Sequence, residues 1–284
     1  MPIVYYYDSK IREFSSAKHV HTSACMSETK IPNRPPLLVW QVESLRMTAF
    51  PSPAAQVATE PTWWTDLLGE PAEKQVVQPK QKARREEGAY EGGKLILTTQ
   101  PARIDWVYVA VDDPEGGQGE PPTIGAFPAT VDLFSRLMLR WFERGACPSV
   151  HRLAFGAVLL QLIGDQQAGY RRMAAYLPNL YLNLEGASDF AYQINRPRNS
   201  TSGVAGLKIN RLSKWAVPIW TMVEFPVTPE AGLQVRQGGA ACRLELDINT
   251  APDFPGDLPH EYLSRIFKEL VNLGQEIAEK GDIP

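Results

Sequence analysis

Residues 241–249 read ACRLELDIN, and from Cys242 onward apolar and polar side chains alternate without interruption. Successive side chains of a β-strand point to opposite faces of its sheet, so this strand has one apolar face and one charged face. Such alternation is typical of antiparallel sheets, which pack one face on a core and leave the other in water. The stretch therefore predicts an antiparallel sheet with one buried face.

Two other kinds of segment extend this interpretation. Residues 153–163, LAFGAVLLQLI, are apolar at almost every position, which indicates a strand at the centre of a sheet. Residues 128–144 and 263–277 repeat apolar side chains at helical spacing, so each predicts a long amphipathic helix. Together they favour the α+β class, with antiparallel sheet covered by long amphipathic helices.

The order of the predicted elements divides the chain. From about residue 37 to 145, and again from 146 to 284, the order is strand, helix, strands and long helix. We therefore predict two pseudo-repeated lobes, each with a helix on its own sheet, after an extended leader over residues 1–36. Residues 70–92 are polar and predict a solvated linker or hairpin tip.

Composition narrows the class of protein. The chain has 284 residues, 44% hydrophobic and 21% charged, which allows a sizeable core and excludes a mostly disordered chain. Its net charge is −3 with Lys and Arg scattered, unlike the basic surface of a dedicated nucleic-acid binder. No apolar run is long enough to span a membrane, and residues 1–30 lack the order of a secretory signal. Three widely spaced cysteines indicate a reducing compartment, so we predict a cytoplasmic protein.

Motifs for metals, cofactors and phosphate loops are missing from the sequence. It contains no G-x-S-x-G elbow, no P-loop and no dinucleotide fingerprint. His19, His21 and Cys25 form one H-x-H-x3-C cluster, but no second cluster nearby completes a zinc site. We interpret them as part of a polar tail and predict no metal and no cofactor.

Catalytic side chains are equally sparse. Cys147 and His151 are sequence neighbours, but a buried thiol is the simpler interpretation of Cys147. Asp105 lies two residues from Arg103 on the same face of a predicted strand, which predicts a structural salt bridge. A small hydrolase built on Asp105 or His151 stays open as an alternative, and an enzyme is not favoured.

Basic residues gather at one predicted hairpin, which turns at residues 199–203. Arg196 and Arg198 lie on its first strand, and Lys208 and Arg211 lie on its second. Guanidinium groups bind phosphate or carboxylate through paired hydrogen bonds, so these four residues are candidates for an anion or nucleic-acid contact. The alternative is that they protect a sheet edge from aggregation.

Four of the seven tryptophans form the other candidate surface. Trp63 and Trp64 are adjacent on a short predicted helix, and Trp215 and Trp220 point to opposite faces of a predicted strand. Aromatic residues are enriched in protein interfaces, so we predict that these four contact a partner. A large aromatic core is the alternative.

The second half of the chain resembles a known group of proteins. The stretches HRLAFG at 151–156, LELDIN at 244–249, LPH at 258–260 and IF at 266–267 are similar to a sporadically distributed family of uncharacterised prokaryotic proteins. The resemblance implies a similar order of elements and no activity. Patchy distribution fits accessory genes, including defence systems.

These observations lead to one expected function and its alternatives. We expect a non-enzymatic partner-binding subunit or adaptor of an accessory system, which binds another protein or itself. An anion or nucleic-acid contact module is the first alternative, and the small hydrolase is the second.

Overall fold

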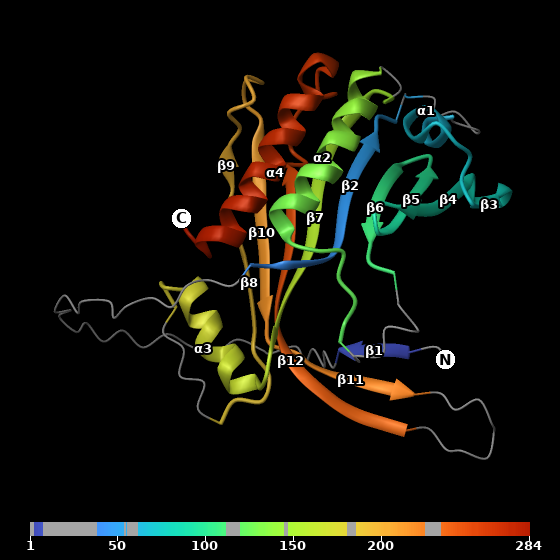
Figure 1. The fold of residues 1–284 in the computed structure, drawn as a ribbon. Coiled ribbons are helices and arrows are strands. Elements are labelled where there is room, and N and C mark those ends of the chain that lie inside the picture. Colours follow the sequence, from blue (N-terminus) through green and yellow to red (C-terminus); the bar gives the residue numbers. More distant parts are fainter. Residues whose placement is uncertain are drawn as a thin grey trace, which may run out of the picture.

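The structure is a computed structural model, and it describes residues 3–7, 39–53, 55, 62–111, 120–144, 147–180, 186–224 and 234–284 (Figure 1). Its strands are β1 (Ile3–Tyr7), β2 (Gln41–Pro51), β3 (Lys74–Gln78), β4 (Ala83–Tyr90), β5 (Gly93–Gln100), β6 (Arg103–Val109), β7 (Val150–Ile163), β8 (Ala191–Asn195), β9 (Arg198–Asn199), β10 (Lys208–Ala216), β11 (Ile219–Glu224) and β12 (Gln234–Thr250). Its helices are α1 (Trp63–Leu68), α2 (Phe127–Glu143), α3 (Gln166–Tyr176) and α4 (Leu263–Lys280), with short 3-10 turns at Pro79–Gln81 and His260–Tyr262.

All twelve described strands belong to one antiparallel sheet. Its order is β1-β11-β12-β7-β2-β6-β5-β4-β3, and β10 joins β8 and β9 to β12. The apolar strand β7 lies near the middle, because β12 pairs with one of its edges and β2 with the other. Hydrophobic side chains on both faces of β7 agree with this central place.

The two-lobe prediction is wrong, and the predicted fold class is wrong with it. β2, from the first predicted lobe, pairs with β7, from the second, between Gln41↔Leu160 and Pro51↔Val150. The sheet therefore continues from one half of the chain into the other. A central strand needs a hydrogen-bonding neighbour at each edge, and β2 supplies the one that the second half lacks. The predicted boundary at residues 145–146 lies outside the described residues.

The helices also differ from the predicted arrangement of one helix per sheet. α2 and α4 lie side by side on a single sheet, where Phe142 and Phe267 pack with ring centroids 5.7 Å apart (Figure 1). Phe155 of β7 faces Phe267 of α4, and Gln161 of the same strand binds Tyr176 of α3, so α3 and α4 share one face. None of the helices that the structure describes lies beside β1 and β11 at the lower right of Figure 1. The molecule is mostly sheet, and the helices cover only part of one face.

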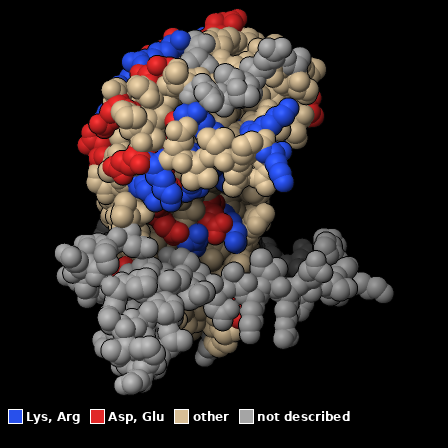
Figure 2. Space-filling model, turned by 90° about the vertical axis from the view of Figure 1, so that its right-hand side faces the viewer, with Lys and Arg blue, Asp and Glu red and all other residues tan. Residues whose placement is uncertain are grey.

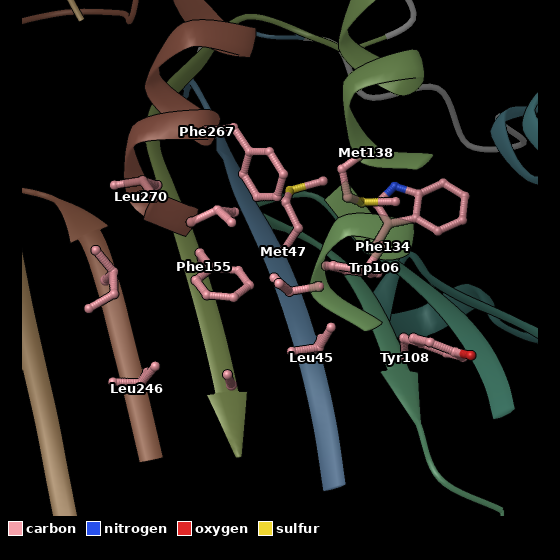
Figure 3. Packing of buried hydrophobic residues seen from close by; sticks show 14 of the residues in the cluster. Leu45, Met47, Trp106, Tyr108, Phe134, Met138, Phe155, Leu246, Phe267 and Leu270 are labelled. Carbon is pink, nitrogen blue, oxygen red and sulfur yellow. The ribbon is translucent and has the colours of Figure 1, made fainter. Parts of the chain in front are cut away.

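The core fills the space between this face and the helices. Phe155 of β7 packs edge-on against Phe267 of α4 with centroids 6.3 Å apart, while Tyr108 stacks on Phe134 of α2 with centroids 6.4 Å apart (Figure 3). One large cluster contains side chains from both halves of the chain. Apolar burial, the main stabilising term, is therefore continuous across the molecule.

The opposite face of the sheet carries polar side chains and ion pairs. Asp105 of β6 accepts hydrogen bonds from Arg103 Nε at 2.6 Å and from Thr48 Oγ1 of β2 at 2.6 Å. This confirms the predicted salt bridge between Arg103 and Asp105. The charged positions of β12 lie on the same face, where Arg243 bonds Glu245 at 3.0 Å.

Three local predictions have outcomes of their own. The polar stretch 70–92, for which a solvated linker or a hairpin tip was predicted, contains the two strands of the β3–β4 hairpin. Of the predicted leader, Ile3–Tyr7 forms β1 paired with β11, and the rest of residues 1–36 lies outside the described residues. Among the described helices, none is long and apolar enough to cross a membrane.

Candidate functional site

A polar groove lies between α4 and the chain that follows β9. Its volume is about 490 Å³. Its lining is dominated by cationic, hydroxyl and amide side chains, namely Arg198, Asn199, Thr201, Ser202, Arg265, Lys268, Glu269, Asn272 and Leu273. We call it the α4 groove.

The helical repeat of α4 supplies one wall of the α4 groove. Arg265, Lys268, Glu269 and Asn272 lie at positions i, i+3, i+4 and i+7, so they share one side of the helix. The apolar stripe of α4 is buried on the sheet, which turns this polar side outward.

The other wall is the hydroxyl-rich segment Ser200-Thr201-Ser202-Gly203. Ser200 Oγ lies 2.7 Å from Ser202 Oγ and accepts a hydrogen bond from Ser202 N at 3.1 Å. Gly203 has φ +99°, and a Cβ there would approach Tyr262 Cε1 to 3.1 Å. A side chain at this position is disfavoured by both the backbone and the neighbour.

The carboxylate of Glu269 is fully engaged by this segment. Its Oε2 accepts from Ser200 Oγ at 2.6 Å, and its Oε1 accepts from Thr201 N at 2.6 Å and Thr201 Oγ1 at 2.8 Å. Hydrogen-bond donors spread and offset the negative charge of a carboxylate. The single acid of the α4 groove is thus satisfied without using any of the groove's cations.

Two of those cations have no acidic partner among the described residues. Arg265 and Lys268 are exposed, and Arg265 lies over the Tyr262 ring at 5.8 Å from its centroid. The third, Arg198, binds Glu276 Oε2 at 2.9 Å and the main-chain oxygen of Pro284 at 2.8 Å. The groove therefore has an electropositive wall.

Acids already pair with three of the four predicted anion-binding residues, namely Arg196, Arg198 and Arg211. Arg198 lines the groove, as described above. Arg196 binds Asp282 through two hydrogen bonds of 2.5 and 2.8 Å, and Tyr192 OH donates to the same carboxylate at 3.1 Å. The hydrogen bond from Arg196 is the main cause that lowers the pKa of Asp282 below its ordinary value.

Arg211 and Lys208 complete the predicted set. Arg211 is buried beneath α4, with Nη2 3.5 Å from Glu276 Oε2, and its Nε and Nη1 have no hydrogen-bond partner among the described residues. Burial and the nearby Arg198 lower the pKa of Arg211. Lys208 is exposed on β10, opposite Asn199 of the groove. The structure thus brings three predicted arginines together, whereas the sequence prediction missed Arg265 and Lys268. The sequence feature that could have indicated Arg265 and Lys268 is the polar side of the last amphipathic helix.

The four predicted partner-binding tryptophans are all buried. Trp63 packs edge-on against Trp141 with centroids 5.4 Å apart, and Trp215 packs on Tyr176 at 5.5 Å. Trp64 stacks on a neighbouring indole, and Trp220 lies over the backbone of β12 at Gly238. A partner could reach these rings only after the core had opened.

Side chains with catalytic potential are not assembled into a reactive site in the described residues. Burial raises the pKa of the Cys147 thiol and raises that of Cys242 to about 12, so both stay protonated near neutrality. Asp105 is occupied by its ion pair, and His151 Nδ1 lies 3.2 Å from the main-chain oxygen of Pro51. The described residues contain no group that could hold a metal ion, and the cluster of His19, His21 and Cys25 lies outside them.

Charge elsewhere is mixed in sign. On the side of the molecule that carries β3, Lys and Arg intermingle with Asp and Glu, and both signs line a shallow hollow (Figure 2). This view gives no continuous basic stripe of the kind that follows a nucleic-acid backbone.

No protein-family model, curated protein or solved structure matches this chain. The function must therefore be inferred from the geometry.

Proposed function

We propose that the protein is a non-enzymatic binding module that recognises an anionic group, phosphate or carboxylate, in the α4 groove. One observation carries the proposal. Arg265 and Lys268 face the groove with no acidic partner in the described part of the chain, while hydroxyl and amide donors satisfy the one carboxylate that lines it, Glu269.

Size and lining support a ligand rather than a chance depression. A volume of about 490 Å³ falls within the range of small-molecule sites. The exposed amide of Asn272 adds an uncharged donor beside the cations, whereas the hydroxyl groups of Thr201 and Ser202 already donate within the hydrogen-bond network around Glu269. Phosphate and carboxylate oxygens take hydrogen bonds from both kinds of donor.

The partner-binding expectation is kept in a narrower form. Since the four tryptophans are buried, we propose that a partner or ligand is held through an anionic group at the α4 groove and not through an aromatic surface. Mixed surface charge and a net charge of −3 make a general nucleic-acid binder the weaker proposal. The free thiols of Cys147 and Cys242 support a cytoplasmic protein.

Calorimetric titration with pyrophosphate and with citrate tests this function. We expect binding that weakens as salt rises, because the contact is ionic. The double variant Arg265→Ala, Lys268→Ala removes both unpaired cations, and it should lower affinity by about tenfold or more, as charge-assisted hydrogen bonds are lost.

The matched control is Arg136→Ala, Arg140→Ala. These two exposed arginines have the same charge and lie four residues apart on α2, away from the α4 groove. The control should bind like the unaltered protein. Equal loss in both double variants, or no binding of either anion, would contradict the proposal.

A further inference from the structure

One edge of the sheet ends in a strand without a neighbour. β3 is last in the strand order, and its inner edge pairs with β4 from Lys74↔Glu87 to Gln78↔Ala83. All five of its residues are exposed, and no described segment pairs with its outer edge. An unpaired edge presents a row of free N–H and C=O groups to another strand.

Edge strands usually carry features that discourage pairing with another chain, such as lysine or proline, and these features are weak in β3. A lysine on an edge strand normally discourages pairing, but Lys74 Nζ is held 3.4 Å from Glu87 of the adjacent strand. Pro79 follows the strand and leaves its donors intact. Val76 and Val77 are 39% and 55% exposed, and they lie on opposite faces of the sheet. Both faces of this edge therefore offer apolar surface to an added strand.

We propose that β3 pairs antiparallel with β3 of a second copy of this chain, so that two sheets join across a twofold axis. This inference is independent of the α4 groove, because β3 is the last strand of the sheet, whereas α4 packs on β7, β10 and β12.

Symmetry and the pleat fix the register. A twofold axis perpendicular to the sheet keeps each face continuous, so residues that oppose each other must come from the same face. The only register that overlaps all five residues then places Val76 opposite Val76 of the second copy. Lys74 faces Gln78 and Val77 faces Gln75, so no like charges meet. This self-complementarity is the reason for choosing a second copy as the occupant.

The association should be weak. Five residues from each copy are far fewer than the roughly 20–30 residues a side of a stable interface. We therefore expect a dimer whose fraction rises with concentration, and a covalent trap is the sharpest test.

The trap is Val76→Cys, compared with Val77→Cys, in a chain that also carries Cys25→Ser. Opposed residues in an antiparallel pair have Cα atoms about 4.5–5.5 Å apart. Disulfides span about 4.4–6.8 Å, so only the cysteine at the axis meets its own copy. Under mild oxidation Val76→Cys should form a disulfide-linked dimer about tenfold faster than Val77→Cys, because only the facing pair satisfies this geometry. The native Cys147 and Cys242 are buried and should not react.

Light scattering on Val76→Lys gives a second readout. Two ammonium groups at the axis repel, so this variant should stay monomeric at concentrations where the unaltered chain dimerises. Matching circular dichroism would show that each variant is folded. Equal crosslinking at positions 76 and 77 would overturn the proposal. So would an unaltered chain that stays monomeric together with a Val76→Cys variant that does not crosslink. Either result would mean that β3 does not pair with a second copy of this chain.

Discussion

Asp282 shows how one carboxylate fastens the end of α4 to the sheet. The residue is only 6% exposed, and its side chain takes both hydrogen bonds that Arg196 of the β8–β9 connection donates. Asp282 N also donates to the main-chain oxygen of Tyr176 at 2.8 Å. Gly281, with φ +82°, makes the turn that brings Asp282 there.

Replacement of this carboxylate by an amide should destabilise the fold. Asp282→Asn keeps the shape but leaves the Arg196 guanidinium without its counter-charge, and we expect a loss of about 2 kcal/mol in the free energy of unfolding. Urea denaturation at pH 7 measures the change. Asp253→Asn, at an exposed aspartate with no ion pair among the described residues, should be nearly neutral.

Stability should also depend on pH through Asp282. Its pKa is lowered in the folded protein, so the unfolded chain binds the proton first as the pH falls. The contribution is complete above the ordinary pKa of 3.8 and is lost as the pH drops through the lower folded value. The difference in stability between the unaltered chain and Asp282→Asn should therefore shrink below about pH 4. A difference that stays constant down to pH 2 would contradict this account.

At the scale of elements, α4 and β10 meet around a buried arginine. Arg211 lies on the helix-facing side of β10, opposite Ile248 of β12, where an apolar residue is the norm. Glu276 of α4 lies near both Arg211 and Arg198. Removing a charge from water is costly, so this pair need not stabilise the fold more than an apolar pair would.

The two partners should respond unequally to substitution. Arg211→Met removes the buried charge and should change the free energy of unfolding by no more than about 1 kcal/mol. Glu276→Gln leaves Arg211 buried without a counter-charge and should cost about 3 kcal/mol. Denaturant titration of both variants measures this asymmetry, and equal losses would show that the pair itself provides the stability.

Individual elements followed from the sequence where periodicity was strong. The alternation of residues 241–249 lies inside β12, and the helical spacing of residues 128–144 and 263–277 corresponds to α2 and α4. β3 and β4 were not predicted as strands. Charged side chains occupy their positions outside the core, so the apolar pattern from which strands were predicted is weak there. Arg84 and Glu86 pair at 2.9 Å inside β4, a stabilising contact that hydropathy cannot reveal.

At the scale of the whole molecule, sequence patterns could not predict which strands pair with each other. An apolar strand such as β7 needs neighbours, but its pattern does not say which strands they are. The choice of β2 joins the two halves into one sheet and one large core, with a small separate apolar cluster of Leu160, Trp220 and Ala241. The similar order of elements in each half was therefore a misleading guide.

One sheet with one core should unfold in a single step. Tryptophan fluorescence reports on both halves, through Trp106 and Trp141 in the first and Trp215 in the second. Fluorescence and far-ultraviolet circular dichroism should give coincident denaturation curves, as expected of one cooperative unit. Two separated transitions would instead support independent lobes.

Only part of the candidate site could be predicted from the sequence. Arg196, Arg198 and Arg211 could be placed together because a hairpin aligns them. Arg265 and Lys268 reach the same region only through the packing of α4 on the sheet, a contact between residues far apart in the chain. The four tryptophans were predicted to contact a partner, but the structure buries them. The sequence alone does not distinguish a large aromatic core from an aromatic contact surface.

The most direct test of the anion-binding proposal is a crystal structure of the full chain soaked in tungstate, whose anomalous signal marks each bound oxyanion. The account predicts a peak in the α4 groove, within hydrogen-bonding distance of Arg265 and Lys268, and its absence in crystals of the Arg265→Ala, Lys268→Ala variant. Peaks confined to other surfaces, with an empty α4 groove, would contradict it.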